Sequence, residues 1–261
     1  MSQPLIHSDV ESRRFGLSVA RAVFTEDVPT KQILEQIFRE RIDVAILRIP
    51  AEKSSEVVTF ERQGIPTVTA DTLVYYIADL EKTEPNPLRN SDLSFDRLGP
   101  PNAHALDALV ETTFAGYTSH YSANPFLRAG MLPGYVEWAR SFSGDDPELF
   151  GWLVSRDGEP VAFATCSRHG PEGEGRLYGV LPNASGGGVY GDLIRFTQRA
   201  LKDAGCSTMK VSTQVQNSAV QKVWSREGFV MKEAHATIHL NALLSASMVP
   251  KRTLPLVVTA E

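Results

Sequence analysis

The sequence predicts an α+β fold, with a mixed central sheet that carries helices on both faces and a smaller, degenerate α+β half-domain before it. Three observations support this prediction. Residues 176–205 read as a strand, a glycine-rich turn and an amphipathic helix. The order helix, strand, helix, long strand occurs within residues 1–82 and again between residues 192 and 240. A polar segment with two prolines, residues 83–92, lies between the two copies.

The glycine-rich turn consists of Gly186, Gly187 and Gly188, and it joins a strand at 177–181 to a helix at about 189–204. Apolar or small residues line one face of that helix at the 3.6-residue period. Free N–H groups at a helix N-terminus attract anions, and glycine lets the backbone approach a phosphate because no Cβ intervenes. We therefore predict a pyrophosphate-binding loop at this turn.

The glycines fit two patterns of nucleotide recognition, and the first of them is incomplete. Gly186, Gly188 and Gly191 satisfy the G-x-G-x-x-G fingerprint of dinucleotide-binding proteins. That fingerprint also requires an acidic residue roughly 20 positions further on, which binds the ribose. The sequence has no Asp or Glu between Asp203 and Glu227. A glycine-rich turn that binds no ligand is a further alternative.

The second pattern starts at Asn183 and continues through the next helix. Asn183 opens the sequence N-x-x-G-x-G directly after V-x-P. Asn217 opens a helix that contains Val220 and residues 223–224 and that ends at residues 228–229. These residues resemble the [Q/R]-x-x-G-x-[G/A] loop and the closing N-x-x-A-x-x-L-Y-x-x-x-G-F segment of the GNAT superfamily of N-acetyltransferases. The resemblance implies a GNAT-type fold, with acetyl-CoA as the co-substrate.

The resemblance also implies which residues bind the cofactor. Asn183 and Ser185 depart from the Gln or Arg and the Arg that the family usually carries, so a cationic contact to the pyrophosphate is missing from this loop. The cofactor site that the resemblance implies consists of Val180, Leu181, Asn183, Gly186, Gly187, Gly188, Val189, Tyr190, Asn217 and Trp224.

Acetyl transfer to an amine needs a hydrogen-bond donor for the thioester carbonyl and a base for the ammonium proton. A strand N–H near Val180 is a candidate for the donor. Glu174, six residues earlier, stands where some GNAT enzymes place a general base. An equal alternative is that Glu174 is a solvated residue of the glycine-rich loop at 170–175. His120 is the alternative base.

Trp224 stands where family members usually carry the Tyr that protonates the leaving thiolate. An indole N–H donates hydrogen bonds but is not a proton source near neutral pH. Three alternatives remain open. The thiolate leaves unassisted, which a thiol pKa of about 8.5 permits; Tyr190 or Tyr178 supplies the proton; or the protein is a module that binds acyl-CoA or a partner without catalysis.

The acceptor is suggested by a narrower resemblance. A segment rich in His and Tyr, residues 116–126, lies between the first two helices of the second part, and Phe and Gly stand at residues 15–16. With the two-part layout, these features resemble the TDP-fucosamine acetyltransferase type, which acetylates an amino sugar carried on a nucleotide. The resemblance implies a small-molecule primary amine as the substrate, and acetylation of a protein amine is a weaker alternative. The implied substrate-binding residues are Tyr117, His120 and Tyr121.

We expect four parts along the chain. These are an N-terminal degenerate GNAT-like α+β domain at 1–82, a linker at 83–92, a GNAT acetyltransferase domain at 93–242 and a C-terminal tail at 243–261. The first domain lacks a glycine loop, so we place no cofactor there. It extends the sheet or lines one side of the acceptor site, or it serves only stability or dimerisation. In the tail, the apolar residues 254–258 are candidates for docking on a neighbouring surface.

Composition excludes several classes of protein. A formal net charge of −5 without a basic block argues against nucleic-acid binding. The sequence has neither a secretory signal pattern nor a run of 18 apolar residues, so we expect no membrane partner. Cys166 and Cys206 are too few for a disulfide framework, and we expect buried thiols and no metal. We expect a cytoplasmic protein, and a homodimer is compatible with the sequence.

Overall fold

The structure, a computed structural model, describes residues 3–127 and 131–245. The chain divides into two compact units, and the larger of them comprises residues 71–235. The chain passes between the units within two long strands, β4 (Thr67–Asp79) and β10 (Val230–Asn241).

Within the described residues, the smaller unit consists of 3–70 together with 236–245. Strand β1 is antiparallel to β2, β2 is parallel to β3, and β10 follows β3 in the strand order. Ile33 and Ile37, four residues apart on α2, are fully buried against the sheet together with Ile238 of β10. The complete elements are β1 (Ile6–His7), α1 (Asp9–Phe15), β2 (Val19–Val23), α2 (Thr30–Glu40), β3 (Val44–Pro50), the 3₁₀ helix η1 (Ala51–Glu56) and α3 (Val57–Arg62).

The larger unit is built on strands in the order β4-β9-β8-β7-β6-β5, with β10 beside β4. Strands β8 and β9 are parallel, and the other pairs whose register is known are antiparallel. The turn between β6 and β7 contains Asp157 and Gly158, both with positive φ, as the Asp-Gly pair predicts for a tight hairpin. The strands are β5 (Leu93–Arg97), β6 (Leu149–Arg156), β7 (Glu159–His169), β8 (Glu172–Val180) and β9 (Thr208–Gln214).

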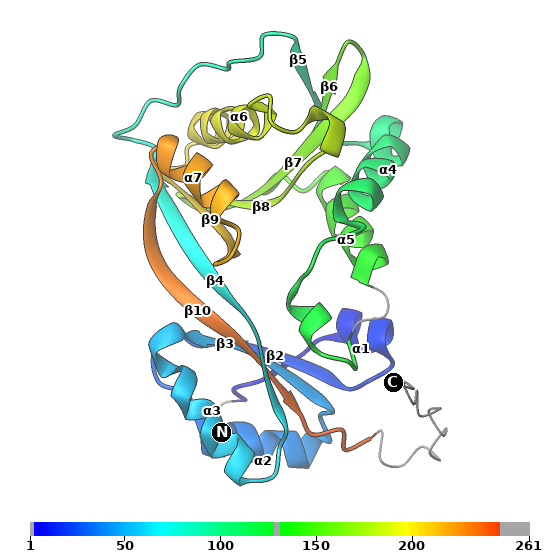
Figure 1. The fold of residues 1–261 in the computed structure, drawn as a ribbon, viewed down its shortest axis with the longest axis vertical. Helices are drawn as coiled ribbons and strands as arrows, with labels where there is room; N and C mark the ends of the chain where they lie inside the picture. Colours follow the sequence, from blue (N-terminus) through cyan, green and yellow to red (C-terminus); the bar gives the residue numbers. More distant parts are fainter. Residues whose placement is uncertain (1–2, 128–130, 246–261) are drawn as a thin grey trace, which may run out of the picture. The chain divides into compact units, whose positions relative to one another are not determined.

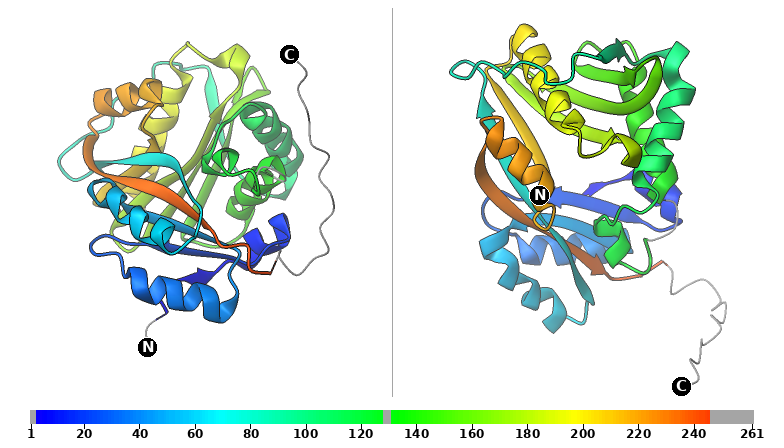
Figure 2. Two further views of the ribbon diagram at one scale, coloured as in Figure 1. Left: turned by 60° about the horizontal axis from the view of Figure 1, so that its bottom comes forward. Right: turned by 45° about the horizontal axis from the view of Figure 1, so that its top comes forward.

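Helices cover both faces of this sheet (Figures 1 and 2). The first face carries α4 and α5, and their core includes Leu106 and Phe163. The second face carries α6 and α7, and their core includes Leu193 and Trp224. Helix α6 packs closely on β8 at Gly173, where an added Cβ would lie 2.7 Å from Leu201 Cδ1. The helices are η2 (Pro100–Asn102), α4 (Ala103–Phe114), η3 (His120–Ala123), α5 (Met131–Arg140), η4 (Ser141–Ser143), η5 (Pro182–Ala184), α6 (Val189–Asp203) and α7 (Ser218–Arg226).

This architecture confirms the predicted α+β class with a mixed sheet. The proposed domain boundaries at residues 82, 92 and 242 rest on a repeated order of elements in the sequence. The compact units are defined by contacts and do not test that repeat, so the boundaries stay a prediction. The apolar residues 254–258 lie outside the described residues. No helix in the described parts of the chain is both long enough and apolar enough to cross a membrane.

Candidate functional site

The glycine loop, residues 181–188, leaves the end of β8 and opens α6. Gly186 and Gly188 have φ values of 87° and 86°, in the left-handed region where a side chain is strained. Gly188 is the N-cap of α6, and no side chain caps the helix there. An added Cβ at Gly186 or Gly187 would meet no atom within 4 Å. The N–H groups at this end of α6 therefore face open space, as an anion-binding loop requires.

A segment that we call the strap, residues 83–92, runs along α6 and is fixed to its first turn (Figure 1). Asp192, which is completely buried, accepts hydrogen bonds from the N–H groups of Arg89 at 2.8 Å and Asn90 at 3.0 Å. It also accepts a bond from Asn90 Nδ2 at 2.7 Å and one from Arg195 at 2.8 Å. Burial alone would raise the pKa of Asp192, but these hydrogen bonds outweigh it and lower that pKa.

The strap also has a second anchor, further along α6. Asn86 Nδ2 donates to Glu227 at 2.9 Å, and the same carboxylate accepts from Arg195 Nε at 2.9 Å. Arg199 donates to the carbonyl of Pro85 at 3.3 Å. The predicted linker segment thus has a defined path on the larger unit.

Near the glycine loop, β8 is no longer paired with β9. The two strands are in register over three pairs, the last of which is Glu174 with Lys210, although β8 continues to Val180. A β-bulge at Arg176 interrupts the register of β8 with β7. The N–H of Leu181 donates to the carbonyl of Val161 at 2.9 Å. Because successive N–H groups of a strand point to opposite edges, the N–H of Val180 faces the open side.

Tyr190, in the first turn of α6, is paired with Trp224 of α7. Trp224 Nε1 donates to the Tyr190 hydroxyl at 3.1 Å, so the hydroxyl retains its own hydrogen for another acceptor. The hydroxyl of Tyr178, by contrast, donates to Thr197 at 3.0 Å and lies 3.1 Å from Cys166 Sγ. Burial raises the pKa of both tyrosines. Of the two tyrosines, Tyr190 has the hydroxyl that is available as a donor.

Glu174 lies on the face of β8 opposite α6. Its neighbours Gly173 and Gly175 face the α6 side, where added Cβ atoms would meet Leu201 and Tyr178, and strand alternation turns Glu174 the other way. Its carboxylate accepts a hydrogen bond from Arg176 at 2.6 Å, and its side chain is 21% exposed. The predicted base is therefore partly shielded but reachable by water.

Tyr117 belongs to a polar cluster with Gln214 and Asp71, neither of which was a predicted site residue. Its hydroxyl donates to Gln214 Oε1 at 3.1 Å, and Gln214 Nε2 lies 3.3 Å from Asp71 Oδ2. Asp71 Oδ1 is buried and lacks a hydrogen-bond partner among the described residues. Burial, and secondly the charge of Asp71, raises the pKa of Tyr117. Asp71, Gln214 and Tyr117 are far apart in sequence, so no local spacing could have revealed the cluster.

His120 and Tyr121 pack against each other in η3, with ring centroids 3.9 Å apart. His120 is buried. The ring of Tyr117 packs elsewhere, edge-on against Phe114 and Tyr135 at centroid distances of 5.2 and 5.8 Å. The three predicted substrate residues thus divide into a His120–Tyr121 pair and the separate cluster around Tyr117.

The remaining predicted cofactor residues lie in the glycine loop, at the start of α6 and at the N-cap of α7. Asn217 caps α7 by accepting from the N–H of Val220, and its Nδ2 donates to Thr213 at 3.0 Å. Asn183 is exposed in η5, beside the loop glycines. Val189 is buried at the start of α6. Leu181 uses its N–H for Val161 and its carbonyl for Ala184, so its main chain supports the loop itself.

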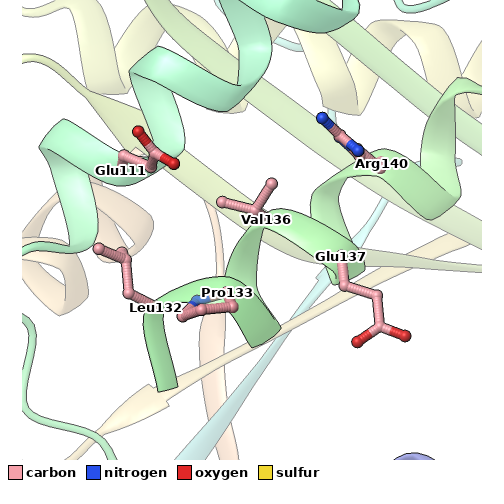
Figure 3. A pocket seen from close by; sticks show the side chains of 6 residues that line it. All are labelled: Glu111, Leu132, Pro133, Val136, Glu137 and Arg140. Atoms are coloured by element: carbon pink, nitrogen blue, oxygen red, sulfur yellow. The ribbon is translucent and has the colours of Figure 1, made fainter. Parts of the chain in front are cut away.

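A surface hollow of about 360 Å³ lies between α4 and α5 (Figure 3). Figure 3 shows apolar Val136 between the charged side chains of Glu111 and Arg140. None of the predicted site residues lines it. Its lining consists of Glu111, Leu132, Pro133, Val136, Glu137 and Arg140.

Neither cysteine lies in an arrangement suited to a metal ion. Cys166 and Cys206 are both buried free thiols, and burial raises the pKa of Cys166 to about 12. Among the described residues there is no group of three or more His, Cys, Asp or Glu side chains that could hold a metal ion.

Residues 118–229 match the model of the Acetyltransferase (GNAT) family. This part of the chain, less than half of it, is thus similar to the GNAT family. This segment contains the glycine loop, the open edge of β8, α6 and α7, which are the features that the predicted cofactor site needs. The family uses acetyl-CoA, so the loop's anion-binding geometry agrees with a cofactor that contains a pyrophosphate.

Similar proteins extend this comparison. Over 90 residues the chain is 37% identical to a mycothiol acetyltransferase of Streptomyces avermitilis, a stretch that covers 34% of this chain and 29% of that relative. Among solved structures, a GCN5-related N-acetyltransferase of Sphaerobacter thermophilus has a TM-score of 0.63 at 16% identity, covering 90% of this chain and 74% of that one. A functionally unknown Staphylococcus epidermidis protein also has a TM-score of 0.63, at 12% identity, with 92% of each chain covered. These structures share the fold.

Proposed function

We propose that the chain is an acetyl-CoA-dependent N-acetyltransferase that acetylates the primary amine of a small molecule by direct attack in a ternary complex. The observation that carries the proposal is the uncapped N-terminus of α6 behind Gly186 and Gly188, next to an edge of β8 that β9 leaves unpaired. Both features lie within the segment that matches an acetyltransferase family, which indicates an enzyme of that class.

The residues of the glycine loop fit the cofactor. The N–H groups of Gly187, Gly188, Val189 and Tyr190 surround the open start of α6 and would hold the pyrophosphate. The N–H of Val180 would receive the developing negative charge on the thioester oxygen. When bound, acetyl-CoA supplies the acyl group and a thiol leaving group. Alignment of the amine with the thioester contributes up to roughly 7–11 kcal/mol in ideal cases.

Two side chains move protons in this proposal. Glu174, partly shielded and held by Arg176, takes the ammonium proton of the acceptor, directly or through one water. Tyr190 holds a proton for the departing sulfur, because Trp224 donates to its oxygen and leaves its O–H to donate. Trp224 thus contacts Tyr190 without taking up the hydrogen of its hydroxyl. His120 is the alternative to Glu174 as the base.

The acceptor that we favour is an amino sugar, including one carried on a nucleotide. The sequence features that resemble the TDP-fucosamine type suggest a sugar-linked amine, and the relatives that match part of the chain are named mycothiol acetyltransferases. Asp71, whose Oδ1 is buried and has no hydrogen-bond partner in the described parts of the chain, offers a negative charge to an ammonium group beside Tyr117 and Gln214. Tyr121 and His120 offer ring faces for a sugar or a base.

A panel of primary amines tests the proposal. The panel contains amino sugars, nucleotide-linked amino sugars, aminoglycosides and lysine peptides, each assayed with acetyl-CoA by the release of free thiol. We expect turnover of at least one amino sugar and none of the peptides. Acetylation of peptides alone would favour a protein-amine acetyltransferase. CoA binding without turnover of any amine would favour a binding module.

Replacement of Tyr190 separates assisted from unassisted departure of the thiolate. Tyr190→Phe is expected to lower kcat by roughly 10²-fold, because it removes a positioned proton donor and little volume. Trp224→Phe is expected to keep kcat within about 3-fold, since Tyr190 retains its own O–H. The affinity for CoA, measured by calorimetry, should stay unchanged in both variants. Equal, small effects of both replacements would mean that the thiolate leaves without help.

A further inference from the structure

The glycine loop lacks a cation of its own. Between Arg176 and Arg195 the sequence contains no Lys or Arg, and residues 183 and 185 are Asn and Ser. Arg195 does not serve this purpose, because its side chain is buried and engaged by Asp192 and Glu227. Backbone N–H groups carry only partial charges, whereas an ionised donor strengthens a hydrogen bond to phosphate about twofold. A pyrophosphate bound to this loop would therefore be held more tightly if another segment of the chain supplied an arginine.

The strap brings one arginine to that place. The N–H of Arg89 is fixed to Asp192 at 2.8 Å, and Asn90 Nδ2 donates to the carbonyl of Gly187 at 3.1 Å. An added Cβ on Gly188 would lie 3.6 Å from Asn90 Nδ2 and 3.9 Å from Arg89 Cδ. The far end of the aliphatic stem of Arg89 thus lies beside Gly188, the glycine that opens α6.

The guanidinium of Arg89 is available for a ligand. The residue is exposed, and its side chain has neither a hydrogen bond nor an ion pair to any other part of the described chain. The other basic side chains around the strap are engaged. Arg156 pairs with Asp92 at 2.7 Å, and Lys202 pairs with Glu84 at 2.6 Å.

We infer that Arg89 binds the pyrophosphate of the cofactor and supplies the cationic contact that Asn183 and Ser185 do not provide. This inference rests on the proposed function. It explains why Asp192, an acid in the first turn of the helix, does not oppose an anion there: its carboxylate is turned into the protein, where Arg195 and the strap satisfy it. Asp192 is accordingly a positioning residue, which holds the strap so that Arg89 reaches the loop.

The test measures the affinity of the full chain for three ligands by calorimetry at low salt. CoA carries a pyrophosphate and a 3′-phosphate, dephospho-CoA keeps only the pyrophosphate, and pantetheine has neither. Arg89→Ala is expected to raise the Kd of CoA and of dephospho-CoA by the same factor, roughly 10-fold, and to leave pantetheine unchanged. Arg89→Lys should retain part of the affinity, since the charge remains but the two-pronged geometry is lost.

Arg199→Ala is the matched control. It removes the same charge and a contact between α6 and the strap, but it lies further along the helix from the glycine loop. We expect its Kd for CoA to stay within about 2-fold of the parent value. Equal losses in Arg89→Ala and Arg199→Ala would mean a general electrostatic effect and would overturn the inference. A loss for CoA that is absent for dephospho-CoA would assign Arg89 to the 3′-phosphate instead.

Failure of the inference is distinct from failure of the proposed function. If the parent protein binds CoA and Arg89→Ala binds it equally well, the inference is wrong and the cofactor site stands. If the parent binds neither CoA nor dephospho-CoA, the proposed function itself fails.

Discussion

Gly188→Glu is expected to abolish the binding of CoA. Gly188 has a φ of 86°, where a side chain adds strain of roughly 1–3 kcal/mol. The Cβ of the new side chain would also lie 3.6 Å from Asn90 Nδ2, which donates a hydrogen bond to the carbonyl of Gly187 in the loop. Its carboxylate would then repel a pyrophosphate bound at the N-terminus of α6. The measurement is the shift in melting temperature that saturating CoA causes, which we expect for the parent and not for the variant.

Gly205→Glu controls for backbone strain and for the added charge. Gly205 follows the other end of α6, has a φ of 88°, and an added Cβ there would meet no atom within 4 Å. We expect this variant to be less stable than the parent but to keep its full CoA shift. NAD should stabilise neither protein, because no acidic residue stands between Asp203 and Glu227 to bind a ribose. A CoA shift that survives in Gly188→Glu would show that the loop is misassigned.

The period of apolar residues predicted those helices that pack one face on a sheet. The helix expected at about 189–204 is α6, Val189–Asp203, because its buried face requires only a flat sheet to pack on. The glycine loop was predictable for a similar reason. Positive φ at Gly186 and Gly188 is a local requirement that glycine meets at little cost. Sequence patterns report such local constraints well.

The strap and its anchors could not be predicted from the same patterns. Residues 83–92 have the polar, proline-containing composition of a linker, and composition does not reveal what a polar group binds. Asp192 reads from the sequence as an ordinary acid in a first helical turn. Its partners Arg89 and Asn90 lie about a hundred residues earlier, so only the tertiary structure joins them.

The same limit applies to the choice between Tyr190 and Tyr178 as the proposed proton donor. From the sequence, Tyr190 is the predicted catalytic tyrosine and Tyr178 an alternative, and both lie near the glycine loop. The hydrogen bond from Trp224 to Tyr190 and the engagement of Tyr178 by Thr197 distinguish them. The residue that breaks the family pattern, Trp224, is thus the one that contacts the proposed substitute. The roles themselves stay predictions.

Glu174→Gln is expected to lower kcat/KM by roughly 10²–10⁴-fold, the range for loss of a positioned general base. Gln is nearly isosteric and can still accept a hydrogen bond from Arg176, so the strand geometry should persist. The affinity for CoA should be unchanged, because Glu174 lies on the face of β8 away from α6 and its loop. Raising the pH should restore part of the rate, since a larger fraction of the acceptor amine is then already neutral.

Glu172→Gln is the matched control for this prediction. Glu172 lies two residues earlier on β8 and therefore faces the same side, but it is exposed and pairs with Thr208 before the two strands separate. We expect this variant to keep the parent's kcat/KM within about 2-fold at every pH. If Glu174→Gln is as active as Glu172→Gln across the pH range, the base is another residue. His120→Asn would then be expected to show the loss and the recovery at high pH.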